Sequence, residues 1–141
     1  MIIYKTILES SLTIFSLNKA YFLQYLNRKE ESLELIHDIV EFHPDNGMYL
    51  DTYGDILMYF EKYEDAVKQF KDSLELSEED WYTPQTYIKL GICYKELGNS
   101  KLAKNYLAKG KEITKKSSLE EDKKQKWFKI ADLFLSEIEL L

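Results

Sequence analysis

Few residues in this sequence have the type and the spacing that catalysis or metal binding requires. Glu34 and His37 lie three positions apart, which on a helix is the spacing of one half of a carboxylate-bridged di-metal site. The sequence holds two histidines and no second Glu-x-x-His pair. We therefore predict that His37 is a surface or packed side chain and that the protein has no metal site.

Cys93 is the one cysteine, and with a distant histidine it would form a nucleophile pair. It lies two positions after Gly91 in an apolar stretch that is expected to be buried between helices, so we predict an inert thiol. One cysteine also excludes an internal disulfide and a Cys-based zinc site. An intracellular, cytoplasmic protein is the natural interpretation.

Two glycines in the stretch YIKLGICYKELGN, Gly91 and Gly98, raise the question of a phosphate-binding loop. The sequence contains neither GxxxxGK(S/T) nor GxGxxG, so these glycines do not form a loop of that kind. Glycine inside a helix costs about 1 kcal/mol relative to alanine, so Gly91 needs a packing reason. We predict no catalytic residue, no cofactor and no enzymatic activity.

Charge limits the class of partner. The 141 residues carry a formal net charge of −6, which argues against nucleic acid because phosphate binding relies on Lys and Arg. The cationic run Lys123–Lys126 is predicted to be the polar face of a helix. The apolar N-terminal stretch, residues 1–17, is interrupted by Lys5 and Glu9, so we expect no membrane-spanning segment and no membrane partner.

Apolar residues recur with helical periodicity over most of the chain. Five glycines and two prolines are too few for a β-rich fold of this size, which would need many tight turns. Thr83 followed by Pro84 predicts a helix N-cap and first turn. The sequence therefore predicts an all-α fold of helix–turn–helix pairs and one long terminal helix. The helical stripes run through residues 20–26, 32–42, 48–60, 66–76 and 118–141.

The helix pairs also repeat in sequence. A shift of 37 residues places Gly91 on Gly54 and Ala103 on Ala66. A further shift of 34 residues places Gly54 on Ala20 and Ala66 on Ser32, so both positions are again occupied by small residues. Self-similarity of this period is typical of helical repeat proteins.

This pattern resembles the tetratricopeptide repeat, in which an aromatic residue, Leu-Gly, Tyr, Ala, Phe and Pro recur over 34 residues. Leu90, Gly91, Tyr94 and Ala103 match it, and Leu107 replaces the usual Phe. The resemblance implies an α-solenoid of antiparallel helix pairs in a right-handed superhelix. Its repeats would span residues 13–46, 47–83 and 84–117, with a capping helix at 118–141. Residues 1–12 would be a helical extension or part of a preceding repeat, and a longer array stays open.

The repeat pattern has a physical reason. Two antiparallel helices approach closely only where the facing side chains are small, so we expect Gly91 and Ala103 to face each other at the crossing. Tyr94 and Leu107 would fill the space beside them. Because repeats bury their apolar faces by stacking, the terminal helix is expected to cap the array.

The resemblance also implies a non-catalytic protein-interaction module or scaffold. In this family the first helix of each pair lines a concave groove that binds a peptide or a partner helix. We expect tyrosine and methionine burial to drive binding, tuned by Asp51, Asp55 and Lys89. The groove-facing candidates by register are Asn18, Tyr21, Tyr25, Asp51, Asp55, Met58, Tyr59, Gln85, Ile88, Lys89, Ile92 and Lys95.

Some members of the family bind acidic chaperone tails through a clamp of Lys, Asn and Arg side chains. At the corresponding positions only Lys89 is cationic, so an adaptor of that type is not expected. Two other interpretations stay open: another surface binds the partner, or the chain is a small acidic chaperone that sequesters hydrophobic segments of a client protein. We expect a protein or peptide partner and a monomer or weak homodimer.

Overall fold

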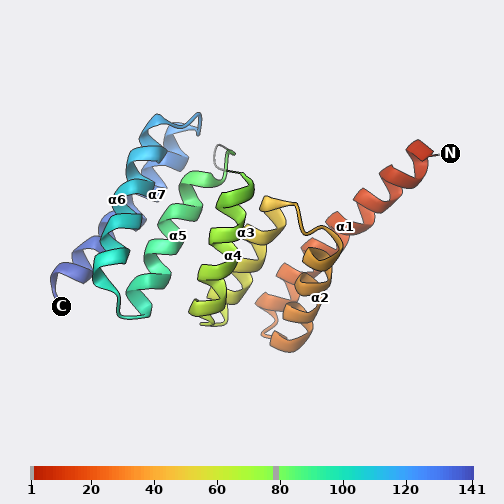
Figure 1. The fold of residues 1–141 in the computed structure, drawn as a ribbon, viewed down its shortest axis with the longest axis horizontal. Helices are drawn as coiled ribbons and strands as arrows, with labels where there is room; N and C mark the ends of the chain where they lie inside the picture. Colours follow the sequence, from red (N-terminus) through yellow and green to blue (C-terminus); the bar gives the residue numbers. More distant parts are fainter. Residues whose placement is uncertain (1, 78–79) are drawn as a thin grey trace.

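Seven α-helices account for nearly all of the chain in a computed structural model that describes residues 2–77 and 80–141 (Figure 1). Within those residues there is no β-strand, and no helix is both long and apolar enough to cross a bilayer. The prediction of an all-α fold is confirmed. The helices are α1 (Ile2–Tyr25), α2 (Lys29–Phe42), α3 (Gly47–Tyr59), α4 (Tyr63–Leu76), α5 (Thr83–Glu96), α6 (Ser100–Lys116) and α7 (Glu121–Glu139).

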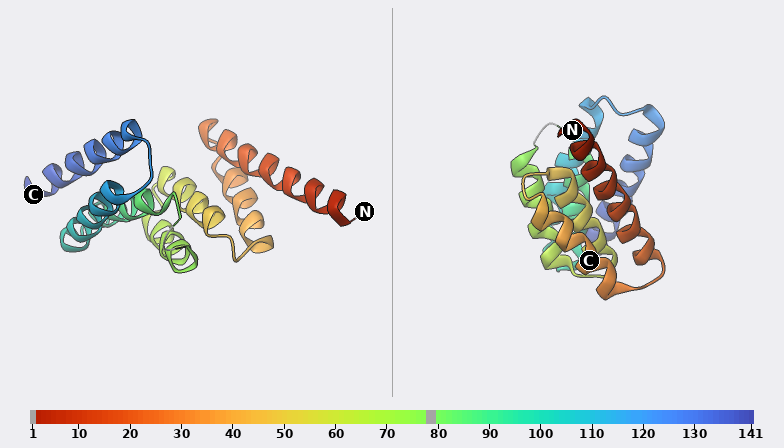
Figure 2. Two further views of the ribbon diagram at one scale, coloured as in Figure 1. Left: turned by 90° about the horizontal axis from the view of Figure 1, so that it is seen from above. Right: turned by 90° about the vertical axis from the view of Figure 1, so that its right-hand side faces the viewer.

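The first six helices form three antiparallel pairs that stack side by side, and α7 lies against α5 and α6 (Figure 1). The stack is arched, with α1 and α7 at its two ends on the same side (Figure 2). This arrangement is the helical-repeat solenoid that the sequence predicts. Residues 2–12 are continuous with the rest of α1.

The turn inside each pair has the same backbone conformation. Asn27, Glu61 and Gly98 all have positive φ, at 57°, 60° and 79°, at positions related by the 34- and 37-residue shifts. After each of them the next amide donates back to the carbonyl five residues earlier, as from Lys62 N to Leu57 O at 2.9 Å. Such a bond closes the end of a helix and satisfies its last carbonyls. The repeat therefore extends from the sequence to the turn geometry, and Gly98 turns the chain as predicted.

The glycines of the repeat each receive one large side chain. A Cβ on Gly91 would come within 2.5 Å of Leu107 Cγ, and a Cβ on Gly54 would overlap the Phe70 ring. Leu107 is therefore the side chain that packs on Gly91, and the prediction that Gly91 and Ala103 both lie at the crossing stays a prediction. A large side chain fills the space that glycine leaves and keeps the interior close-packed.

At the C-terminal end, α7 covers the last pair. Ala131 and Ile138 are buried together with Ile88, Ala103 and Leu107 in one apolar cluster. The partly buried hydrophobic residues Trp127, Phe134 and Leu135 pack against this cluster. The helix thus buries one face on α5 and α6, as expected of a cap.

One local prediction needs correction. Helix α5 begins at Thr83 with Pro84 in its first turn, but the N-cap position is Tyr82 and makes no side-chain cap. The Thr83 hydroxyl instead donates to the carbonyl oxygen of Ser77 at 2.8 Å. The hydroxyl therefore joins the start of α5 to the end of α4 rather than capping its own helix.

We predict that Glu61→Gly stabilises the fold. A non-glycine residue in the left-handed region costs about 1–2 kcal/mol, part of which is offset by the extra freedom of glycine in the unfolded chain. The free energy of unfolding in urea should therefore rise by about 0.5–1 kcal/mol.

Two variants serve as controls for this substitution. Asn27→Gly should give a smaller gain because asparagine tolerates positive φ, and Glu64→Gly, inside α4, should lower stability by up to about 1 kcal/mol. Equal effects of the two glutamate substitutions would contradict the role of the turn.

Candidate functional site

A buried cluster of charged and polar side chains connects all three helix pairs. Lys89 Nζ of α5 lies 2.9 Å from Asp51 Oδ2 and 2.7 Å from Asp55 Oδ1, both on α3. The Thr86 hydroxyl donates to Asp51 Oδ1 at 2.6 Å. The Tyr21 hydroxyl of α1 lies 3.4 Å from Asp55 Oδ2, which it reaches as a long hydrogen bond. Asp51 and Asp55 share a face of α3 because they are four residues apart.

The cluster holds its charges out of water. The side chains of Lys89 and Asp51 are 10% and 8% exposed, and that of Asp55 is 26% exposed. Buried charges are tolerated only when they are paired and hydrogen-bonded. Lys89 is shared between both carboxylates, so the cluster carries one net negative charge when both are ionised.

This environment changes the titration of its members. Burial raises the pKa of Asp55 to about 6, although the Lys89 ammonium opposes that shift, and the neighbouring Asp51 carboxylate adds to it. Burial and the Asp55 carboxylate raise the pKa of Tyr21 to about 12. Burial alone would lower the pKa of Lys89, but the two carboxylates raise it above its ordinary value. Lys89 therefore stays charged, and Asp55 is the group that titrates near neutral pH.

Four of the predicted groove residues lie beneath the surface. Asp51 and Lys89 belong to the cluster, and Ile88 is fully buried under α7. Gln85 is buried as well, and its amide nitrogen donates to the Tyr82 carbonyl oxygen at 2.6 Å in the orientation that satisfies both groups. These four side chains support the face from below.

The other predicted residues reach the surface to different degrees. Tyr25 and Tyr59 are 72% and 48% exposed and bring α1 and α3 together in an edge-to-face contact with ring centroids 6.3 Å apart. Asn18 is also exposed. The partly exposed members are Tyr21, Asp55, Met58, Ile92 and Lys95.

Helix α7 contributes residues that the sequence did not identify. Lys95 Nζ lies 2.6 Å from Glu137 Oε2 and 5.2 Å from the centre of the Phe134 ring. Lys95 is therefore held by α7. Thr86 was also missed, although it lies three positions before Lys89 and so shares its helix face. The helical spacing was a signal for Thr86, whereas nothing local in the sequence showed that α7 folds back on α5.

The residues considered for chemistry are placed as packed or inert groups. The His37 ring lies 6.2 Å from that of Tyr53 in an edge-to-face contact. Cys93 is buried, and burial raises the pKa of its thiol to about 12, so the reactive thiolate is disfavoured. The expectation of a buried cysteine is confirmed.

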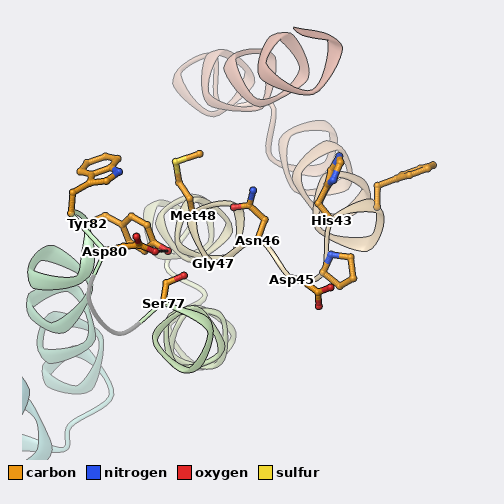
Figure 3. Close-up of a pocket in the computed structure, with 11 residues that line it drawn as sticks. His43, Asp45, Asn46, Gly47, Met48, Ser77, Asp80 and Tyr82 are labelled. Carbon is orange, nitrogen blue, oxygen red and sulfur yellow. Dashed lines mark hydrogen bonds between the residues drawn. The ribbon is translucent and has the colours of Figure 1, made fainter. Parts of the chain in front are cut away.

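A hollow lies at the start of α3. It has a volume of about 620 Å³ and lies between the α2–α3 turn and the α4–α5 connection (Figure 3). Polar and aromatic groups line it, among them His43, Asp80 and Tyr82. The His43 ring is held in an edge-to-face contact with Tyr49. The sequence did not predict this hollow, which two separate connections create.

Sequence and structure comparisons agree on the fold. The tetratricopeptide repeat family profile matches residues 46–116, half of the chain, whereas comparison with curated protein sequences finds no match. PcrH from Pseudomonas aeruginosa, in complex with the chaperone binding region of PopD, has a TM-score of 0.77 at 11% identity, covering 94% of this chain and 93% of PcrH.

Two further solved structures are similar. The type III secretion chaperone SycD from Yersinia enterocolitica, in complex with a peptide of the translocator YopD, has a TM-score of 0.77 at 11% identity, covering 92% of this chain and 94% of SycD. The tetratricopeptide repeat domain of Sgt2 from Aspergillus fumigatus has a TM-score of 0.71 at 13% identity, covering 90% of this chain and 76% of the Sgt2 chain. At these identities the likeness shows the fold alone.

We predict that Lys89→Met is strongly destabilising. It would leave two carboxylates buried without their counter-ion, which costs about 3–5 kcal/mol of unfolding free energy. Urea unfolding at neutral pH measures the loss. Lys111→Met, which removes the surface ion pair with Asp132, should cost at most about 1 kcal/mol. Adding Asp51→Asn and Asp55→Asn to Lys89→Met should recover part of the loss; equal effects of the two lysine substitutions would contradict the role of the cluster.

The free energy of unfolding should depend on pH through the titration of Asp55. Its pKa is raised from 3.8 to about 6 in the folded state, so the native protein binds this proton more tightly than the unfolded chain does. The contribution of Asp55 is fully present below about pH 4 and is lost as the pH rises through about 6.

Comparison of two variants isolates this contribution. Between about pH 4 and 7, the free energy of unfolding of the wild type should fall by on the order of 1–3 kcal/mol more than that of Asp55→Asn. The exposed Asp45→Asn substitution should leave the wild-type profile unchanged. Parallel profiles for wild type and Asp55→Asn would show that Asp55 titrates normally.

Proposed function

We propose, because the chain belongs to the tetratricopeptide repeat family, that it is a non-catalytic protein-interaction module whose concave face binds an extended apolar peptide or a partner helix. One observation carries this proposal. Side chains from the first helix of each pair, α1, α3 and α5, remain accessible on that face above a polar cluster that is itself internally paired.

The accessible side chains suit apolar anchoring. Tyr25 and Tyr59 present large rings, and the partly exposed Met58 and Ile92 extend the apolar surface. Aromatic side chains supply much contact area for little lost conformational freedom, which is why they dominate binding energy at interfaces. The Lys89 cluster holds α1, α3 and α5 together beneath them, so the face is largely preformed.

Most charged side chains of the concave face already form ion pairs within the protein. Lys89 is engaged by two aspartates and Lys95 by Glu137. Asp55 is the partly exposed carboxylate of the buried cluster and is the acidic group that a ligand could meet. Recognition therefore rests on apolar contact, and Asp51 and Lys89 act through the support they give to this surface.

The similar structures supply an analogy for this role. PcrH and SycD were each solved with a segment of another protein bound, PopD and YopD respectively. The analogy also favours the second candidate function, a small acidic chaperone that sequesters hydrophobic segments of a client, since SycD is a secretion chaperone of this fold. A fold hosts many functions, so the binding face must decide between them.

Location and repeat division complete the proposal. A cytoplasmic location is supported by the single buried Cys93, a thiol that neither forms a disulfide within the chain nor presents itself to an oxidant. We further propose three repeats at residues 13–46, 47–83 and 84–117 and a capping helix at 118–141. The bounds at residues 46 and 117 are supported because both residues lie outside the helices.

Selection of peptides from a random displayed library tests the binding face. Peptides selected on the wild type should bind the double variant Tyr59→Glu, Ile92→Glu at least tenfold more weakly, because two charges replace apolar contacts. Leu76→Glu, an apolar-to-acidic change on α4, is the matched control and should bind as the wild type does. Thermal unfolding checks that all variants fold.

The outcomes separate the two functions. Selected peptides that bind wild type and double variant equally would show that another surface is used. The chaperone function additionally requires that the wild type keeps an aggregating apolar test peptide in solution at equimolar ratio, as measured by light scattering. Binding without such protection supports the interaction module alone.

A further inference from the structure

The first half of α1 is a helical arm with an apolar surface. Every residue from 2 to 12 is exposed, and packing onto the body begins near Thr13. Figure 1 shows this part of α1 projecting beyond α2. The arm nevertheless carries Tyr4, Leu8 and Leu12, which are 79%, 63% and 58% exposed. An isolated helix of this length is marginal in water, and so large an apolar surface signals an interaction.

The apolar residues follow a spacing that predicts pairing of helices. Tyr4, Leu8, Phe15, Phe22 and Tyr25 occupy five of seven successive positions of a heptad pattern, and the other two positions are Ser11 and Asn18. Phe15 and Phe22 are 68% and 64% exposed, so the stripe runs beyond the arm and along most of α1. We call Tyr4, Leu8, Phe15 and Phe22 the α1 seam, because Tyr25 at the last position is in edge-to-face contact with Tyr59 of α3. A seam at heptad spacing is the surface that one helix presents to another in a coiled coil.

The α1 seam points away from the body. At about 100° per residue, its positions lie on the opposite side of the helix from Ala20 and Leu23, which are buried against the body. Helix α1 therefore has two apolar sides, of which the solenoid covers one. The other side is where a further helix would stack if the array continued.

The area of this surface matches that of a stable interface. Ten large apolar side chains of α1 are more than half exposed. Since each large side chain carries on the order of 150–250 Å² when fully exposed, together they present on the order of 1,000 Å². A stable interface buries about 800 Å² on each partner, and a typical monomer exposes a single apolar patch of only about 300–600 Å².

The two ends of the solenoid differ, and the difference identifies the partner. The outer face of α7 is mostly polar, with Lys126 and Lys129 exposed and Leu133 exposed beside them, so it offers little apolar surface for the α1 seam of another copy. A head-to-tail chain of copies is therefore disfavoured. The complementary apolar surface on a second copy is its own α1 seam, and contact between identical patches closes into a two-fold dimer.

We propose that α1 pairs with α1 of a second copy through the seam residues Tyr4, Leu8, Phe15 and Phe22, forming a two-fold dimer. Ser11 and Asn18 are polar residues inside the seam, and such residues fix the register of paired helices. The dimer does not depend on peptide binding, and it leaves Met58 and Ile92 of the concave face outside the contact.

Sedimentation equilibrium of the full chain tests the pairing. The wild type should behave as a reversible dimer across micromolar concentrations. The double variant Leu8→Glu, Phe15→Glu should dissociate at least about a hundredfold more readily, because each change places a charge in the seam. The control, Thr6→Glu with Ser10→Glu, adds the same charge to the same helix outside the seam and should stay dimeric.

A spectroscopic measurement guards against loss of folding as the cause. Cys93 is buried and poorly reactive, so Ser10→Cys accepts a single spin label on the exposed arm. Dipolar coupling between labels should appear for this chain and disappear when Leu8→Glu and Phe15→Glu are added, with circular dichroism unchanged. A wild type that is monomeric throughout, or a seam variant that dimerises as the control does, would overturn the proposal.

Discussion

Close contact between the two helices of each pair is the constraint on which the rest of the structure depends. In the second pair it is made by the Phe70 ring over Gly54, and in the third by Leu107 over Gly91. Any side chain at the glycine positions would overlap its neighbour, so the pair would have to separate. Because separation would open voids in a close-packed interior, these contacts fix the thickness of the stack and thereby the positions of α3 and α5 on its concave side.

A polar network connects the three helix pairs to one another. Lys89 of the third pair contacts Asp51 and Asp55 of the second pair, and Tyr21 of the first pair contacts Asp55. The pairs could stack through apolar contacts alone, but apolar contacts specify angles weakly, whereas a shared ammonium group requires particular positions of its carboxylates. The cluster therefore couples the three helix pairs on the concave side of the stack.

The first and last helices, α1 and α7, differ in the polarity of the surface that they expose to solvent. Helix α7 buries Ala131 and Ile138 and turns a charged side outward, whereas α1 presents apolar side chains on the side away from the body. Solenoid repeats bury their apolar faces only against a neighbour, and this side of α1 has none among the described residues. The concave face and the α1 seam are therefore separate surfaces with separate physical origins.

The sequence by itself determined the helices, the repeat and the turns, because those features depend on local spacing and on residue size. The 34- and 37-residue shifts located Gly54, Gly91 and the turn at Gly98 correctly. Only the tertiary structure decided that the Leu107 side chain lies directly over Gly91, and that Lys89 and Asp51 pair beneath the concave face. These relations join residues on different helices, and they depend on crossing angles and on the return of α7 over α5. Helical periodicity shows which side of a helix a residue occupies, but contact across helices is set by how all the pairs stack at once.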